Sequence, residues 1–180
     1  MLFSGENIKV VADFLKNKKT PLVVDPVLVS TSGARLLQPS ALKILTTRLL
    51  PLATLVTPNL SEAEILSGQK ISSLEAMSAA AQKIHSDFGC AVLIKGGHLR
   101  DSKQATDIFF DGQAGLILRA PFMKGIRTHG TGCVYSAAIC ATLAQGKTLT
   151  EAVKTGKTFV TRAISKSYRI GKHFALGIGQ

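Results

Sequence analysis

Short apolar runs that end abruptly are the feature that most limits how this chain can fold. One run, Leu22–Val24, ends at Asp25–Pro26, and a second, Leu55–Thr57, ends at Pro58. A third, Ala91–Ile94, follows a long stretch with helical spacing. Runs this short and this uniformly apolar are typical of strands buried on both faces of a parallel sheet. Proline suits the end of such a strand because it has no N–H to pair with a neighbour.

The segments between and after these runs carry apolar residues at helical spacing. Capping boxes, in which Ser or Thr precedes Glu by three residues, predict helix starts at Ser61, Ser72 and Thr148. Gly89 is a suitable stop for the helix that begins at Ser72. The predicted helices cover residues 6–18, 39–50, 61 onward, 72–88, 132–145 and 148 onward.

Two strand-like runs, Asp107–Phe110 and Leu116–Arg119, flank Asp111–Gly112 and predict a β-hairpin. The order of elements therefore predicts an α/β layered fold with a mainly parallel sheet, formed by residues 1–180 as a single domain. Ligands of such sheets bind beyond the carboxyl ends of the strands. Polar residues at those ends, such as Asp25 and Lys95, are expected at one edge of the sheet.

Composition excludes several classes of protein. No apolar run reaches the roughly 18 residues of a membrane-spanning helix, and the first ten residues do not resemble a signal peptide. Three cysteines without a C-x-x-C pair argue against a disulfide framework and a structural zinc site. We therefore expect a soluble cytoplasmic protein. The net charge of +11 is interpreted as a solvated surface, or as a field that attracts phosphorylated substrates. Nucleic acid is not an expected partner, because no recognised motif accompanies the charge.

The segment Thr128–Cys133, which reads T-H-G-T-G-C, is the sharpest chemical motif. It leads into an apolar helix, whose first N–H groups have no partners within the helix. Glycines let the backbone approach a ligand, so these N–H groups and the helix dipole form an anion site suited to a transferring phosphoryl group. The segment is not a Walker A loop, because Thr131 stands where lysine is required. An ordinary tight loop before a buried helix is the alternative.

Cys133 lies in the predicted first turn of that helix, where the dipole favours the thiolate. There it can accept a proton from a substrate hydroxyl or orient that hydroxyl. A small core cysteine is the alternative, and it is the interpretation for Cys90 and Cys140.

Asn59 and Glu62 stand three residues apart at a predicted helix start, and therefore on one face. A carboxylate there can hold magnesium directly or through water. Alternatively, Asn59 caps the helix and Glu62 complements its dipole. Asp25 is a similar oxygen ligand or a turn residue before proline. Lys95 either reaches a nucleotide phosphate or extends to water.

Together these motifs match a known family along nearly the whole chain. Five blocks stand in family order, and their combined agreement is specific although each block alone is weak. The blocks are Val23–Val27, Leu50–Ala53, Thr57–Glu64, Leu93–His98 and Thr128–Cys133, the last followed by Ser136–Ile139. The chain resembles the hydroxymethylpyrimidine (phosphate) kinase branch of the ribokinase-like superfamily.

The resemblance implies a three-layer α/β/α fold, a homodimer, and ATP- and Mg²⁺-dependent chemistry. The implied reaction phosphorylates 4-amino-5-hydroxymethyl-2-methylpyrimidine and then its monophosphate, in thiamine biosynthesis. It also implies an anion hole over the γ-phosphate and a cysteine in place of the aspartate base of sugar kinases. The implied residues are Gly130, Thr131, Gly132 and Cys133 for catalysis; Asn59, Lys95 and Thr131 for nucleotide; Val27, Met1 and Cys133 for the pyrimidine; and Asp25 and Glu62 for the metal.

The resemblance sets Met1–Ser4 opposite an internal block of family members, so the chain corresponds to the C-terminal two-thirds of the family fold. A fragment, a mis-assigned start and a shortened descendant all fit this expectation. Pyridoxal and hydroxyethylthiazole kinases use related loops and remain alternatives. From a different class, a non-catalytic fragment of the pyrimidine kinase is the other alternative.

Overall fold

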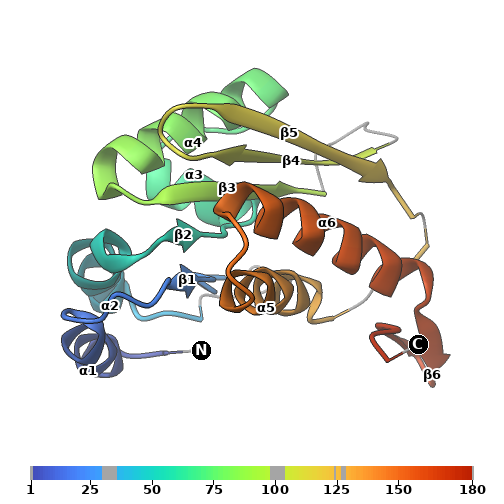
Figure 1. The fold of residues 1–180 in the computed structure, drawn as a ribbon, viewed down its shortest axis with the longest axis horizontal. Coiled ribbons are helices and arrows are strands. Elements are labelled where there is room, and N and C mark those ends of the chain that lie inside the picture. The colour runs from blue at the N-terminus through green and yellow to red at the C-terminus, as the bar shows by residue number, and fades with distance from the viewer. Residues whose placement is uncertain (1, 30–35, 98–103, 124, 127–128, 180) are drawn as a thin grey trace.

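The computed structural model describes residues 2–29, 36–97, 104–123, 125–126 and 129–179. Its centre is a five-stranded sheet with the strand order β1-β2-β3-β4-β5 (Figure 1). The strands are β1 (Val23–Val24), β2 (Leu55–Val56), β3 (Ala91–Gly96), β4 (Gln104–Phe110) and β5 (Gly115–Pro121). The first three pair in parallel, and β4 pairs antiparallel with both β3 and β5. Of these five strands only β4 therefore points the other way, which confirms the mainly parallel α/β sheet.

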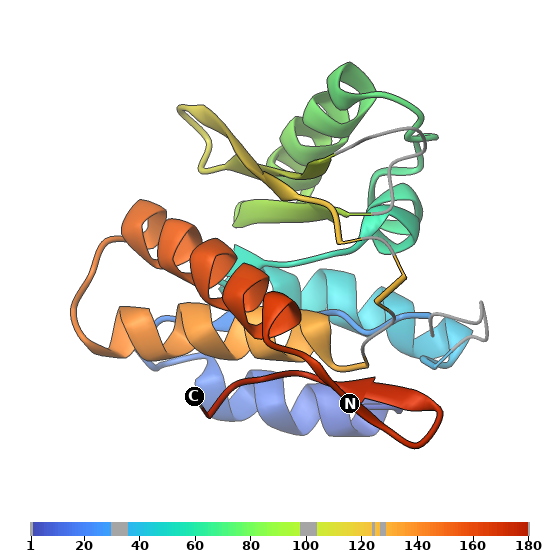
Figure 2. The ribbon, with the colours of Figure 1, turned by 90° about the vertical axis from the view of Figure 1, so that its right-hand side faces the viewer.

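Helices cover both faces of the sheet. One layer contains α1 (Gly5–Leu15), α2 (Pro39–Ile44), α3 (Leu60–Ser67) and α4 (Leu74–Phe88). The other contains α5 (Thr131–Ala144) and α6 (Leu149–Ser165), which lie side by side (Figures 1 and 2). Along β3, Val92 and Ile94 join the core of the first layer, whereas Ala91 and Leu93 join the core under α5 and α6. This alternation explains why β3 is apolar throughout.

The predicted hairpin is confirmed at Asp111. Its carboxylate accepts the backbone N–H groups of Gln113 and Ala114 at 2.9 and 2.8 Å, which closes the turn between β4 and β5. The predicted stop at Gly89 is also confirmed, because that residue ends α4 in the left-handed conformation at φ 74°.

Several helix boundaries differ from the predictions. The capping box expected at Ser61 is wrong, because Asn59 caps α3 instead. Ser73, not Ser72, caps α4. The helix expected over residues 39–50 is interrupted, since a π-helical turn, η1 (Leu45–Leu49), and a 3₁₀ turn, η2 (Leu50–Leu52), follow α2. Pro51 cannot supply an N–H to continue an α-helix, so the chain changes helix type before it.

A short C-terminal hairpin was not predicted. It consists of β6 (Tyr168–Ile170) and β7 (His173–Ala175), with Gly171 at φ 58° in the turn. Its residues are exposed or only half-buried, so the sequence offers no clear apolar alternation. Among the described residues, no helix is both long and apolar enough to cross a membrane.

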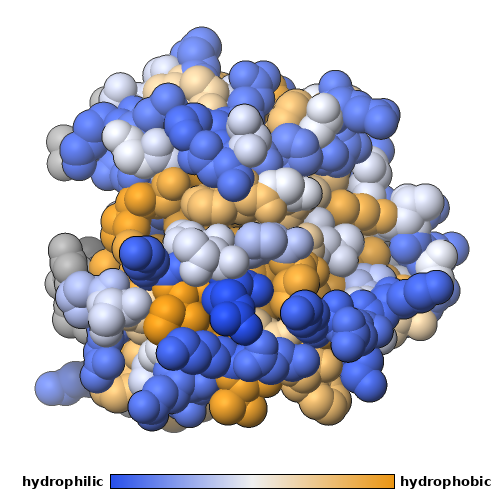
Figure 3. Space-filling model, turned by 90° about the vertical axis from the view of Figure 1, so that its left-hand side faces the viewer, coloured by the Kyte–Doolittle hydropathy of each residue, from blue (hydrophilic) through white to orange (hydrophobic). Residues whose placement is uncertain are grey.

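The two ends of the sheet differ in character. The turn of the β4–β5 hairpin lies at the left of Figure 1, and Figure 3 views the molecule from that side. Hydrophobic side chains form a band across this face between two hydrophilic areas. The carboxyl ends of β1, β2 and β3 lie at the other end, and the polar residues predicted to do chemistry lie there.

Candidate active site

The carboxyl ends of β1 and β3 bring two charged side chains together. Asp25 follows β1, and Lys95 is the next-to-last residue of β3. The Lys95 Nζ donates to Asp25 Oδ1 at 3.0 Å, although 70 residues separate them in sequence. The backbone N–H of Lys95 donates to the Pro58 carbonyl at 2.8 Å. Lys95 therefore has a fixed backbone and a side chain that bridges toward β1.

The glycine-rich start of α5 lies directly against this ion pair. A Cβ on Gly132 would stand 3.0 Å from Lys95 Nζ and 3.5 Å from Asp25 Oδ2. Gly130 precedes the helix at φ 80°, a left-handed conformation that glycine adopts without strain. No side chain caps the helix at this position. The N-terminal N–H groups of α5 and the Lys95 amine thus form one positively polarised surface, which suits an anion.

Cys133 lies in the first turn of α5, as predicted, and its side chain is exposed. Cys90 is buried, and burial raises the pKa of its thiol to about 11. The interpretation of Cys90 as a core residue is therefore confirmed. Cys140 is exposed, so the prediction that it is a buried core residue is wrong.

Asn59 and Glu62 form a reciprocal capping box at the start of α3. Asn59 Oδ1 accepts the Glu62 N–H at 3.0 Å, and Glu62 Oε2 accepts the Asn59 N–H at 2.9 Å. Glu62 Oε1 accepts a third N–H, from Leu28, at 3.0 Å. Burial raises the pKa of the Glu62 carboxyl, while the Asn59 N–H and the charge of Lys95 oppose that rise. The buried Glu62 carboxylate thus connects α3 to the chain that follows β1 through hydrogen bonds.

Val27 is held in an unusual conformation beside that joint. Its φ of 47° lies in the left-handed region, which is unfavourable for a β-branched residue. The hydrogen bond from the next N–H, that of Leu28, to Glu62 helps to hold this conformation. Val27 is half-buried, at the same end of the sheet as Asp25. Met1, the other residue expected at the pyrimidine, lies outside the described residues.

The acidic residues fit a magnesium ion in different ways. Mg²⁺ usually takes one or two carboxylates and completes its shell with water and substrate phosphates. Asp25 Oδ2 faces the start of α5, whereas both oxygens of Glu62 already accept N–H groups. Within the described part of the chain, no cluster of three or more His, Cys, Asp or Glu side chains could hold a metal. The Oδ2 atom of Asp25 is therefore better placed to meet a cation than the Glu62 carboxylate, which is buried with both oxygens bonded.

Two contacts near the site were not predicted from the sequence. The ring of His129, next to Gly130, stands 5.8 Å from the ring of His173 in β7, so the C-terminal hairpin lies beside the glycine loop. Asp107 in β4 forms a buried ion pair with Lys157 in α6. Neither pair has a local sequence signal, because the partners are at least 44 residues apart in the printed sequence.

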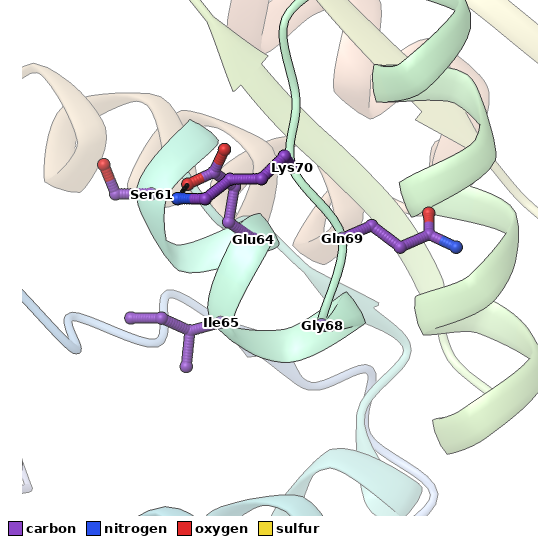
Figure 4. A pocket seen from close by; sticks show the side chains of 6 residues that line it. All are labelled: Ser61, Glu64, Ile65, Gly68, Gln69 and Lys70. Atoms are coloured by element: carbon purple, nitrogen blue, oxygen red, sulfur yellow. Dashed lines mark hydrogen bonds and ion pairs between the residues drawn. The ribbon is translucent and has the colours of Figure 1, made fainter.

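A shallow hollow of about 220 Å³ lies away from these residues, on α3 and the turn that follows it (Figure 4). There Glu64 binds Lys70 at 3.1 Å and accepts the Ile71 N–H at 2.9 Å. No residue predicted to take part in chemistry lines it, so we assign it no role in the site.

Comparison with known proteins agrees with this geometry. The family model for phosphomethylpyrimidine kinase matches residues 1–176. The chain belongs to the phosphomethylpyrimidine kinase family. It is 44% identical over 177 residues to the hydroxymethylpyrimidine/phosphomethylpyrimidine kinase of Aquifex aeolicus, a match that covers 98% of this chain and 69% of that protein.

Solved structures of this family and of pyridoxal kinases share the fold. Phosphomethylpyrimidine kinase from Clostridium difficile is 37% identical with a TM-score of 0.79, covering 91% of this chain and 66% of that one. Pyridoxal kinase from Staphylococcus aureus, in complex with AMP-PCP and pyridoxal, is 36% identical with a TM-score of 0.89, covering 99% and 65%. The expected ribokinase-like fold is confirmed. The chain spans about two thirds of the length of these relatives.

Proposed function

We propose that this chain carries the phosphoryl-transfer site of an ATP-dependent kinase of thiamine biosynthesis. Its substrates would be 4-amino-5-hydroxymethyl-2-methylpyrimidine and the monophosphate of that alcohol. The observation that carries the proposal is the contact of the α5 start, at Gly132, with the Lys95–Asp25 pair. The family match supports the choice of substrate.

The chemistry follows from the placement of charge. The substrate hydroxyl oxygen attacks the γ-phosphorus of ATP, and the bond from that phosphorus to the ADP oxygen breaks. Charge on the transferred group is stabilised by the N–H groups of Gly130, Thr131 and Gly132 and by the Lys95 amine. In our proposal the exposed Cys133 side chain orients the hydroxyl as a thiol, or accepts its proton as a thiolate. Positioning and charge stabilisation account for most of the rate, because phosphoryl transfer needs little covalent help from the protein.

Asp25 and Glu62 are proposed to serve magnesium, Asp25 directly and Glu62 through water. A bound Mg²⁺ would neutralise charge on the nucleotide phosphates. Asn59 is proposed to lie near the phosphates, since its backbone pairs with Lys95 at the strand ends. Val27 is proposed to line the pyrimidine, together with Met1 and Cys133.

Pyridoxal is the second candidate substrate. The similarity to a pyridoxal kinase solved with AMP-PCP and pyridoxal favours it, because the two chains share a fold over nearly all of this chain. The same site would then transfer phosphate to a hydroxymethyl group on a different ring. We also propose a homodimer in a reducing cytoplasm, on the basis of the family and the three unpaired cysteines.

The test is an ADP-release assay on the full protein that contains this chain. Turnover is measured with hydroxymethylpyrimidine, its monophosphate, pyridoxal and hydroxyethylthiazole, each at several concentrations. We expect the highest kcat/KM with the two pyrimidines and a large loss of kcat in Cys133→Ala at nearly unchanged ATP affinity. Faster turnover of pyridoxal would move the assignment to the second candidate. No turnover with any alcohol, by a folded protein, would contradict the proposed activity and favour a non-catalytic role.

A further inference from the structure

Asp107 in β4 and Lys157 in α6 form a charged pair, and Asp107 stands opposite Lys95 in the sheet. The proposed chemistry does not use this pair. Lys157 Nζ donates to Asp107 Oδ2 at 2.7 Å and to the Ala105 carbonyl at 2.9 Å. Both side chains are buried between β4 and α6. Burial of two charges is costly, and a buried ion pair is weak evidence for a purely stabilising role. The pair therefore needs another explanation.

The other carboxylate oxygen of Asp107 binds the backbone next to Lys95. Asp107 Oδ1 accepts the backbone N–H of Gly96 at 3.0 Å, and Gly96 directly follows Lys95 in β3. In the strand register, Lys95 stands opposite Asp107 and Gly96 opposite Thr106. Gly96 is also confined from the other side, because a Cβ there would collide with the Thr106 carbonyl and with Met77. The peptide that carries Lys95 is thus held between Asp107 and the first-layer core.

The same pair also touches the helix that begins at the glycine loop. Tyr135 stands three residues after Gly132 in α5, and burial followed by the charge of Asp107 raises the pKa of its phenol. The Tyr135 hydroxyl is buried and makes no hydrogen bond of normal geometry within the described residues, although Asp107 is near enough to affect it. Gly156 of α6 packs on Tyr135, since a Cβ there would stand 3.0 Å from the ring.

We propose that Asp107, anchored by Lys157, is a positioning residue that sets the Lys95 amine over the N-terminus of α5. The inference rests on the proposed function, because it assumes that Lys95 and the α5 start bind nucleotide phosphates. Its specific content is the route: Lys157 orients the carboxylate, the carboxylate holds the Gly96 N–H, and Gly96 fixes Lys95. A displacement of about 1 Å at such a group can cost on the order of 100-fold in rate.

Two double variants isolate this route. Asp107→Asn/Lys157→Met removes both charges but keeps an oxygen that can accept the Gly96 N–H. Asp107→Leu/Lys157→Met also removes both charges, and it removes that acceptor as well. Neither leaves an unpaired buried charge, so both avoid the large destabilisation that follows when one partner is deleted alone. The full protein that contains the chain is used, with urea unfolding to compare stability.

The kinetic readout separates positioning from stability. We expect the leucine variant to raise KM for ATP and to lower kcat/KM for ATP by about 10- to 100-fold, with KM for the alcohol nearly unchanged. The asparagine variant keeps the acceptor but loses the lysine that orients it, so its KM for ATP should lie between those of the wild type and the leucine variant. A merely structural pair would change the fraction of active protein and leave both KM values alone. Equal KM values for ATP in the two variants would therefore overturn the proposal, whether both are normal or both are raised.

Two further measurements keep the proposal open to refutation. Should the leucine variant not fold, Asp107→Ala/Lys157→Met replaces it with the same expectation. Hydrogen exchange at the Gly96 amide reports the contact with residue 107 without any need for turnover. We expect slow exchange in the wild type and the asparagine variant, and fast exchange in the leucine or alanine variant. Fast exchange in the wild type would refute the route. If the wild type binds Mg-ATP but phosphorylates no pyrimidine, the substrate assignment fails, and the ratio of nucleotide affinities still decides the positioning.

Discussion

Two lysine–aspartate pairs stand near one another on the α5 side of the sheet, and they differ in their access to solvent. In the Lys95–Asp25 pair, 15% and 18% of the two side chains are exposed; in the Lys157–Asp107 pair the values are 10% and 4%. The first pair lies at the carboxyl end of the strands, against Gly132. The second lies between β4 and α6, with each Asp107 oxygen already bonded.

The difference in exposure suits the two lysine–aspartate pairs to two roles, one to bind a ligand and the other to fix the geometry of the backbone. The Lys95 amine lies against Gly132 at the start of α5, where in our proposal it exchanges the Asp25 carboxylate for the phosphates of a ligand. Lys157 has no such freedom, because it is bonded to Ala105 and Asp107 inside the core. A charge that is meant to act on a ligand must keep access to it, whereas a charge that fixes geometry is more effective where water is excluded. We therefore expect substitutions in the outer pair to change activity more than stability, and substitutions in the inner pair to change both.

Loss of Lys157 alone should have the largest effect on stability. In Lys157→Met the Asp107 carboxylate stays buried without its cation, which typically costs about 3–5 kcal/mol. The matched change in the outer pair, Lys95→Met, should cost about 1–2 kcal/mol, because Asp25 remains partly open to water. Urea unfolding of both variants measures the contrast. Equal losses would show that the two environments do not differ in energy.

Loss of Lys95 should have the largest effect on activity. Removing one donor that stabilises transition-state charge typically lowers kcat by about 100- to 1,000-fold. The control is Lys70→Met, which breaks the exposed Glu64–Lys70 pair at the hollow beside α3 and should change neither kcat nor stability noticeably. Steady-state kinetics with ATP and the pyrimidine alcohol tests both variants. A Lys95→Met protein with wild-type kcat would remove Lys95 from the proposed site.

The outer pair could be anticipated from the sequence, and the inner pair could not. Asp25 and Lys95 each follow an apolar run, and the rule that parallel strands end at one edge brings them together. Asp107 lies within the strand expected over residues 107–110, but its partner is 50 residues away on a helix with no marker of the contact. Only the packing of α6 on β4 creates that pair.

Local competition explains the errors at the start of α3. Ser61 and Glu64 have capping-box spacing, and so do Asn59 and Glu62. The second pair prevails because Glu62 also accepts the Leu28 N–H from the chain after β1. In Glu64 the carboxylate instead accepts the Ile71 N–H and contacts Lys70. A tertiary hydrogen bond thus decides which of the two capping-box spacings is used. Sequence spacing alone cannot reveal that hydrogen bond.

A pair of helical glycines gives a smaller and more specific contrast. Gly132→Ala should preserve stability or raise it by up to about 1 kcal/mol, because alanine favours a helix and only the flexible end of Lys95 must shift. The same change should weaken ATP binding by displacing the Lys95 amine. Gly156→Ala should lower stability by about 1–3 kcal/mol, because its Cβ would stand 2.7 Å from Ile139 in the core. Urea unfolding and ATP titration, run on both variants, distinguish the two glycines; a loss of stability in Gly132→Ala comparable to that in Gly156→Ala would contradict the contrast.

The smallest expected effect is a change in how stability depends on pH, and it tests the charge state of the inner pair. Burial raises the pKa of the Asp107 carboxyl above its unfolded value, while Lys157 and the Gly96 N–H oppose the rise. A carboxyl group whose pKa is higher in the folded state than in the unfolded state stabilises the fold at pH values below its unfolded pKa. That stabilisation is lost as the pH increases through the folded pKa. Without Lys157 the main opposing influence on the Asp107 pKa is gone, so the folded pKa moves higher and the loss of stability extends further toward neutral pH.

Lowering the pH from about 7.5 to about 5.5 should therefore narrow the difference in unfolding free energy between Lys157→Met and wild type, because the variant takes up a proton on folding. Urea midpoints measured across this range give the gap, and Asp107→Asn/Lys157→Met, which has no carboxyl at this position, should show no such narrowing. A gap that stays constant or widens on acidification would mean that an unpaired Asp107 charge is not what destabilises the variant.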